Sequence, residues 1–172
     1  GSLRGAATLS NLNHDEFIPA GTFTYRQRLW SLGLENTWRL IQDGRGIYSL
    51  NVNVGGAYDV GETPEAGGRE RLGRIAQGGG RIGVSLGLDR NETVFHAGAS
   101  RRGRFPALRE LYSGALNRFA PNPDLKPEKL TAFEAGVTRR HAAGQLQAVA
   151  FHSRLRDAIV RITLEDRRFM RV

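Results

Sequence analysis

The stretch from Ile47 to Val60, IYSLNVNVGGAYDV, alternates between two kinds of residue along its length. Its even positions are tyrosine, leucine, valine and glycine, whereas its odd positions from Ser49 onward are serine, asparagine, glycine, alanine and aspartate. A helical period of about 3.6 residues would scatter the polar residues among the valines, but a period of two places them on one face. The stretch is therefore predicted to be a long strand with one apolar face and one small or polar face.

The aromatic residues of this strand are spaced like those of a membrane-crossing strand. Tyr48 and Tyr58 lie on the apolar face, roughly 33 Å apart along a strand. In a strand tilted by about 45° the rise becomes roughly 23 Å, close to the apolar band of roughly 25 Å, flanked by aromatic girdles, on an outer-membrane barrel. A long strand of a soluble sheet, whose tyrosines flank a core, fits the same residues.

The composition limits how this chain can meet a membrane or a partner. The 172 residues suffice for one domain with a core, and no apolar run is long enough for a membrane helix, so a membrane location would require a barrel. Lysine and arginine outnumber aspartate and glutamate by 25 to 17, for a net charge of +8. This excess suits nucleic acid, anionic lipid headgroups or an anionic ligand, and composition does not choose among them.

Catalytic and metal chemistry has little support in the sequence. Cysteine is absent, which excludes disulfides, thiolate metal sites and cysteine nucleophiles. The histidines lack metal-ligand spacing, and they are His14, His96, His141 and His152. Glu110 with Tyr112, or Glu134 with His152, could form acid–base pairs, but no nucleophile accompanies them. We therefore expect no enzyme, no metal and no cofactor.

Six strands are expected in an antiparallel up-and-down order, followed by a truncated seventh strand. Their approximate ranges are 22–41, 47–60, 75–88, 93–102, 130–139 and 145–157. Residues 1–21 are predicted to be a polar connector ending in a turn at 19–21, with a ligand-contacting loop as the alternative. Residues 158–172 are predicted to be a connection that enters the seventh strand. The connections alternate between short and long, beginning with the short turn that contains Asp43-Gly44. An all-β chain with alternating short and long connections is typical of a transmembrane barrel, although a soluble meander could show the same alternation.

The facing of these strands follows the same alternation. Trp30, Leu32, Leu34, Trp38 and Leu40 share one face of the first strand, and short apolar sets recur on the strands that follow. The strand at 145–157 gives no clear facing.

The long connection near residues 103–129 carries two motifs, RGRFPALRELYSG and PNPDLKPEKLTAFEAGV. Together they closely resemble the barrel segment of TonB-dependent outer-membrane receptors, most clearly over residues 93–159. The matching residues, in order, are Phe105, Leu108, Glu110, Leu111, Tyr112, Asn122, Pro123, Leu125, Lys126, Pro127, Glu128, Phe133, Glu134 and Gly136.

The resemblance implies a function as well as a fold. It implies a barrel of about 22 strands in the outer membrane of a Gram-negative bacterium, enclosing a plug and importing a scarce ligand such as an iron-siderophore complex or cobalamin. The expected partners are outer-membrane lipid and lipopolysaccharide, the small-molecule ligand, and the TonB energy-coupling complex acting through the plug. Residues 1–172 are then one partial barrel domain, without the plug and the remaining strands. The opening Gly-Ser suggests an excised piece, which is not expected to transport alone.

Within this picture, Arg102, Arg104, Arg109 and Tyr112 are the candidate ligand-binding residues. The arginines, with Arg101, are predicted to form a basic cluster near the outer rim, suited to an anionic ligand or to lipopolysaccharide phosphates. The prolines of the loop favour an architectural role for the motif, with ligand contact as the alternative. Glu134 is expected to be a hydrated lumen carboxylate, or else to pair with a lumen arginine or the plug.

Other classes of protein remain open from the sequence. A basic soluble β-domain that binds nucleic acid or another anionic partner would place aromatic rings beside arginines, whereas the tryptophans and tyrosines of the long strands lie on the apolar face, and no nucleic acid is expected. A porin or adhesin barrel is a nearer alternative, against which the proline-rich motif argues.

Overall fold

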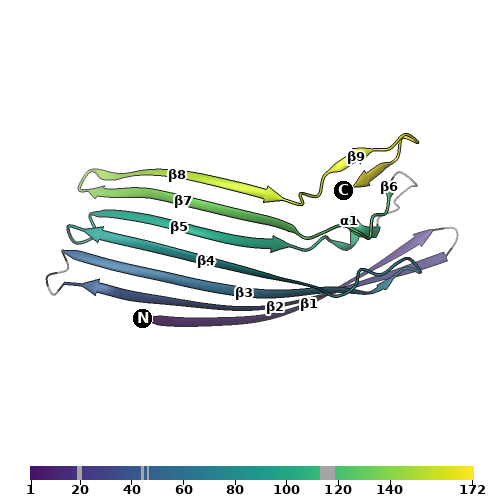
Figure 1. Ribbon diagram of the computed structural model, residues 1–172, viewed down its shortest axis with the longest axis horizontal. Coiled ribbons are helices and arrows are strands. Elements are labelled where there is room, and N and C mark those ends of the chain that lie inside the picture. Colours follow the sequence, from purple (N-terminus) through teal and green to yellow (C-terminus); the bar gives the residue numbers. More distant parts are fainter. Residues whose placement is uncertain (19–20, 44, 46, 113–118) are drawn as a thin grey trace.

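The computed structural model of this chain describes residues 1–18, 21–43, 45, 47–112 and 119–172. Seven strands form one antiparallel sheet in the order β1-β2-β3-β4-β5-β7-β8 (Figure 1). Their bounds are β1 Ser2–Ile18, β2 Gly21–Gln42, β3 Tyr48–Ala66, β4 Ile75–Leu88, β5 Thr93–Arg104, β7 Glu128–His141 and β8 Gly144–Arg156. Each strand pairs with the strand next to it in sequence within this sheet, so the predicted up-and-down order is confirmed.

From β2 to β8, short and long connections lie at opposite ends of the sheet (Figure 1). The turns after β2, β4 and β7 gather at one end, and the long connections after β3 and β5 lie at the other (Figure 1). At the first short turn, Tyr48 donates its backbone N–H to the Asp43 carboxylate at 3.1 Å. Gly44 and Gly46 of that turn lie outside the described residues, as do residues 19–20 of the predicted turn before β2.

The strand register confirms the predicted division of the sheet into an apolar face and a polar face. Residues directly opposite in a ladder share a face, and Val52 is opposite both Trp38 and Val84. The same row continues through Ala97, Ala135 and Ala150. The row of Asn53 on the other face passes instead through Thr37, Gly83, Gly98 and Glu134.

Large side chains on the apolar face are exposed, because none of the described residues packs over them. Trp30 is 51% exposed, Tyr58 56% and Ile82 55%. In water such a surface would be far larger than a soluble protein normally leaves uncovered. The tyrosines therefore flank a surface that faces lipid, and they do not flank the core of a soluble sheet.

The predicted connector at residues 1–21 is wrong, because β1 occupies most of it. β1 pairs with β2 from Ser2 opposite Thr37 to Ile18 opposite Gly21. Leu9 faces Trp30 on the apolar side, but residues 11–16 are polar except for Leu12. This part of β1 lies beyond the apolar band, so its sequence shows no hydrophobic alternation that would mark it as a strand.

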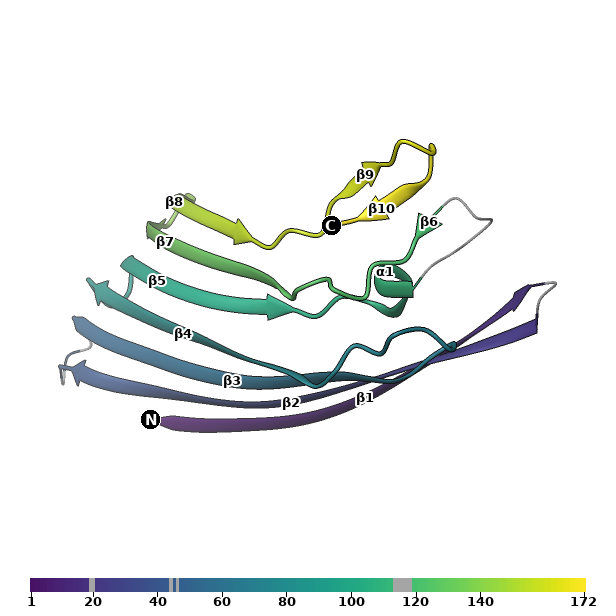
Figure 2. The same cartoon turned by 45° about the vertical axis from the view of Figure 1, so that its right-hand side comes forward.

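The chain end also departs from the prediction. The sequence predicted that one more strand would follow β8 in the large sheet. Instead, β9 (Arg161–Thr163) and β10 (Phe169–Arg171) lie outside that sheet. They form a separate three-stranded sheet with β6 (Phe119–Ala120), which comes from the long connection after β5 (Figure 2).

Two smaller features determine which face of the sheet particular side chains of β2 and β8 occupy. A register shift after Arg39 places Ile41 opposite Leu50, so that Ile41 takes the outward position expected for Leu40. In β8, the strand without a clear facing, Ala148 and Ala150 share the apolar face with Ala135, whereas Phe151 shares the polar face with Glu134.

The one helix in the described part of the chain is α1, Leu108–Tyr112. No helix among the described residues is long and apolar enough to cross a membrane.

Candidate functional site

The connection between β5 and β7 folds back over the polar face of the sheet. Its described parts, residues 105–112 and 119–127, are called the covering segment below. Phe105 packs so closely on Gly61 of β3 that a Cβ at that glycine would lie 2.9 Å from the ring. Gln27 of β2, which is buried, donates its side-chain N–H to the Pro106 carbonyl at 2.7 Å. The sheet wall and the covering segment thus form one packed unit.

A small apolar core holds the covering segment against the wall. Its buried members are Tyr25, Ala66, Leu108, Leu111, Tyr112 and Leu125. The rings of Tyr25 and Tyr112 stack with centroids 5.6 Å apart, and the Tyr112 hydroxyl accepts the Leu72 backbone N–H at 2.8 Å. Burial raises the pKa of both tyrosines, so both hydroxyls stay protonated at neutral pH.

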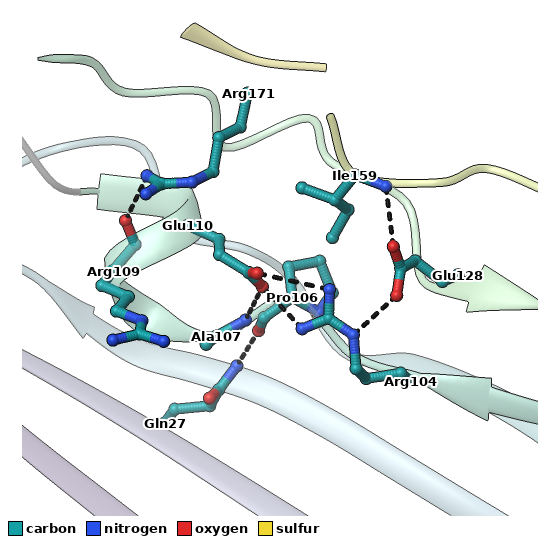
Figure 3. Close-up of polar contacts among 9 residues, drawn as sticks. All are labelled: Gln27, Arg104, Pro106, Ala107, Arg109, Glu110, Glu128, Ile159 and Arg171. Carbon is teal, nitrogen blue, oxygen red and sulfur yellow. Dashed lines mark hydrogen bonds and ion pairs between the residues drawn. The ribbon is translucent and has the colours of Figure 1, made fainter. Parts of the chain in front are cut away.

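Arg104, the last residue of β5, joins the two ends of the covering segment (Figure 3). Its Nε lies 2.6 Å from Glu128 Oε2, at the start of β7. Its Nη1 and Nη2 lie 2.9 and 3.3 Å from the two carboxylate oxygens of Glu110, on α1. One guanidinium therefore bridges two carboxylates, an arrangement that its planar fork favours.

Each of these carboxylates also accepts a backbone hydrogen bond. The Ala107 N–H donates to Glu110 at 2.8 Å, and the Ile159 N–H, which follows β8, donates to Glu128 at 2.8 Å (Figure 3). We call Arg104, Glu110 and Glu128 the arginine clamp. It connects β5, α1, β7 and the connection after β8 at the end of the sheet where the long connections lie.

The pKa values in the clamp follow from this geometry. Burial by itself would raise the pKa of Glu110, but the hydrogen bonds from Arg104 and Ala107 outweigh it and lower the pKa. The Arg104 hydrogen bond, helped by Ile159, lowers the pKa of Glu128. The two carboxylates in turn raise the pKa of Arg104. All three groups are therefore charged at neutral pH.

A further arginine ties the small sheet to the covering segment. Arg171 of β10 donates from Nη1 to the Arg109 carbonyl at 2.9 Å (Figure 3). Its own carbonyl accepts the Asn122 side-chain N–H at 2.8 Å, and its guanidinium lies 4.9 Å from the centre of the Phe119 ring. The hairpin of β9 and β10 is thus packed onto the covering segment.

The polar face of the sheet carries open grooves with charged and amide side chains. One groove of about 560 Å³ is lined by Asn53, His96 and Glu134 among others, and a neighbouring groove of about 600 Å³ by Arg4 and Asp59 among others. The side chain of Arg81 on β4 passes over Gly55 of β3, where there is no side chain, and forms an ion pair with Glu35 of β2. Arg102 lines both grooves. This face can hold water and an ionic or polar solute.

The predicted ligand-binding residues lie in different surroundings. Arg102 is exposed on the polar face, and Arg109 is exposed on α1. Arg104 is held in the clamp, and Tyr112 is only 2% exposed in the small core. Arg101, expected in the same cluster, lies on the apolar face because it is opposite Gly80. Ligand contact by these residues stays a prediction.

The family motif is largely accounted for by packing and pairing around the covering segment. Leu108, Leu111, Tyr112 and Leu125 fill the core, Pro127 is buried, and Glu110 and Glu128 belong to the clamp. Gly136 lies under His96, where a Cβ would come within 2.8 Å of the ring nitrogen.

Several residues of this site were not identified from the sequence. Tyr25, Gln27, Ile159 and Arg171 contact the covering segment from distant parts of the chain, and only their positions in the fold reveal them.

A sheet with an uncovered apolar face, a grooved polar face and a connection folded over the polar side forms part of the wall of an outer-membrane β-barrel. A sequence model of the family described as TonB dependent receptor-like, beta-barrel matches residues 4–169. The chain therefore belongs to this family. The match extends well beyond residues 93–159, where the motifs are clearest. A search of curated proteins finds no match to the chain.

Membership in the family establishes the general role and the location. TonB-dependent receptor barrels sit in the Gram-negative outer membrane, where they bind ligands and import them with TonB coupling. The chain is a segment of such a transporter, not an enzyme.

Proposed function

We propose that residues 1–172 form one part of the barrel wall of a receptor that imports a scarce ligand, an iron-siderophore complex. The observation that carries this proposal is the covering segment, which the arginine clamp holds over the polar face at the end with the long connections. In an outer-membrane barrel the long connections face the outside. A fixed structure at that position gives an arriving solute a defined surface at the entrance to the lumen.

The charges near this entrance favour an anionic ligand. Arg102 on the polar face and Arg109 on α1 are both exposed, and we assign direct ligand contact to these two residues. Arg104 and Tyr112 would act on the ligand through the shape of the wall, because their polar atoms already have partners within the chain. Guanidinium groups suit the carboxylate or phenolate oxygens of an iron chelate.

The rest of the transport cycle would depend on parts outside this segment. Seven strands do not close a barrel of about 22, so the wall needs further strands. Coupling to TonB is assigned to a plug enclosed by the complete barrel. The segment alone would therefore neither transport nor respond to TonB.

The test is uptake of radiolabelled iron by cells that produce the full-length receptor under iron limitation. A panel of ferric siderophores is compared with radiolabelled cobalamin, in cells with and without TonB. We expect TonB-dependent uptake of at least one ferric siderophore. Uptake of cobalamin alone would contradict the proposed ligand class while leaving the receptor family intact.

A variant separates the proposed contact from general charge effects. Arg102→Gln removes one charge-assisted hydrogen bond to the ligand and is expected to weaken its binding by roughly 10- to 100-fold. Arg45→Gln, in the short turn at the opposite end of the sheet, removes the same charge far from the entrance. Equal ligand affinity in the two variants would refute the role of Arg102.

A further inference from the structure

Three long connections of the chain meet on the short helix α1. The covering segment contains α1 itself. The connection after β3, residues 67–74, and the connection after β8, residues 157–172, approach the helix from two other parts of the sheet. Their arginines Arg69 and Arg171 lie 43 and 62 residues along the chain from the helix residues that they contact.

Both arginines bind backbone carbonyls of α1. The last carbonyls of a helix lack partners within the helix, and a cation is favoured at that end. Arg171 donates from Nη1 to the Arg109 carbonyl at 2.9 Å (Figure 3), and Arg69 donates from Nη1 to the Tyr112 carbonyl at 2.6 Å. Each neighbouring connection thus satisfies one carbonyl of the same helix.

Apolar packing joins the same three connections. Leu72, from the connection after β3, and Ile159, from the connection after β8, are partly buried against the small core that contains Leu111 and Tyr112. The backbone N–H of Leu72 also donates to the Tyr112 hydroxyl at 2.8 Å. The two neighbouring connections therefore contact α1 through both polar and apolar groups.

A helix of five residues depends on these contacts, because so short a helix is not stable by itself in water. If one connection moved away, a carbonyl of α1 would lose its charged donor and part of the core would be exposed. The contacts of the other two connections with α1 would weaken as a result. We propose that α1 couples the three connections, so that they separate from the barrel wall together, as one cooperative unit.

This coupling has a consequence for the entrance to the lumen. The Arg109 side chain is exposed on α1, so a ligand that binds it would stabilise all three connections at once, and loss of the coupling would weaken that ligand's binding by the same factor. This consequence rests on the proposed ligand contact, whereas the coupling itself does not.

The test is hydrogen exchange of the full-length receptor without ligand, so its outcome does not depend on which ligand is imported. The reporters are the amides of Leu72, Asn122 and Ile159, one in each connection. Each of them donates a hydrogen bond of 2.8 Å that would break when the unit opens. Amides in the ladder between β3 and β4 report on the wall.

The variant Arg171→Gln removes one hydrogen bond from a charged donor, so the reporter amides should exchange roughly 10- to 100-fold faster. Coupling predicts the same factor at all three amides, including Leu72, although the Arg171 side chain is bonded to a different connection. Conversely, Arg69→Gln should accelerate exchange at Ile159. Arg171→Lys, which keeps a charged donor, should have a smaller effect.

The matched control is Arg168→Gln, which removes the same charge from the hairpin of β9 and β10. The Arg168 guanidinium pairs with Asp166 at 2.6 Å within that hairpin, so this variant should leave the three reporters unchanged. Faster exchange at Ile159 with no change at Leu72 would show that the connections open independently. Equal acceleration in the control, or in the ladder between β3 and β4, would also overturn the proposal.

The unmodified receptor decides the question if the variants do not assemble. Its exchange is measured at increasing guanidinium concentrations too low to unfold the barrel. One common opening free energy and one denaturant dependence at the three amides support the coupled unit. Three different values contradict it.

Discussion

Replacing Leu111 by alanine should release the covering segment while leaving the barrel wall in place. The Leu111 side chain is completely buried in the small core between the segment and the wall. A buried Leu→Ala change costs 2–5 kcal/mol, depending on how well the cavity collapses. Because the wall is held by long strand ladders that Leu111 does not join, we expect a cost of about 3 kcal/mol to fall on the segment alone.

Hydrogen exchange of the full-length receptor measures this local cost. The reporters are the amides of Asn122, bonded to the Leu111 carbonyl at 2.8 Å, and of Leu72, bonded to the Tyr112 hydroxyl at 2.8 Å. A loss of about 3 kcal/mol corresponds to roughly 100-fold faster exchange at these amides. Amides in the ladder between β3 and β4 should be unaffected.

The matched control is Leu146→Ala, which removes the same atoms from a leucine of β8 that is 74% exposed on the apolar face. It should leave the reporter amides unchanged. Equal acceleration in both variants, or uniform acceleration across the whole sheet, would refute the view that the covering segment is a separately stabilised unit.

Two further predictions follow from the facing of β3 and from the arginine clamp. Val52→Arg should impair assembly in the membrane by about 2–4 kcal/mol while Asn53→Arg is tolerated, measured as the folded fraction in lipid vesicles; similar folded fractions would refute the facing. The lowered pKa values of Glu110 and Glu128 mean that the clamp stabilises the fold above the ordinary glutamate pKa of about 4.3 and loses this contribution as pH falls through the lowered values. Cleavage of the covering segment by an acid-active protease should therefore accelerate below about pH 4, and replacing both glutamates by glutamine should abolish that pH dependence.

The sequence predicts those strands that cross the apolar band and is least informative outside it. From Tyr48 to Val60 every second side chain meets a different environment, so alternation reveals both the strand and its facing. In β1 the residues from Asn11 onward lie beyond the band, where either face tolerates polar side chains, and only pairing with β2 makes them strand. In β8 apolar residues occur on both faces, so the register with β7 was needed to orient it.

The site shows the same limit. The family motif includes Glu110 and Glu128, but it does not predict that both pair with Arg104. That pairing depends on α1 folding back toward the end of β5. The helix has five residues, too few to produce a helical periodicity in the sequence. Tyr25 and Gln27 are more than 70 residues from the covering segment that they contact, and no local pattern links them.

The central claim is that β3 has one face toward lipid and the other toward a hydrated lumen. The 172 residues contain no cysteine. Single cysteines introduced at positions 50 to 55 can each carry a nitroxide label in a full-length receptor from which any cysteine outside this segment has been removed, within lipid bilayers. Accessibility to oxygen, which partitions into lipid, should be high at Leu50, Val52 and Val54, and accessibility to a water-soluble nickel chelate should be high at the alternate positions. Accessibility without this alternation would contradict the assignment of the sheet as a barrel wall.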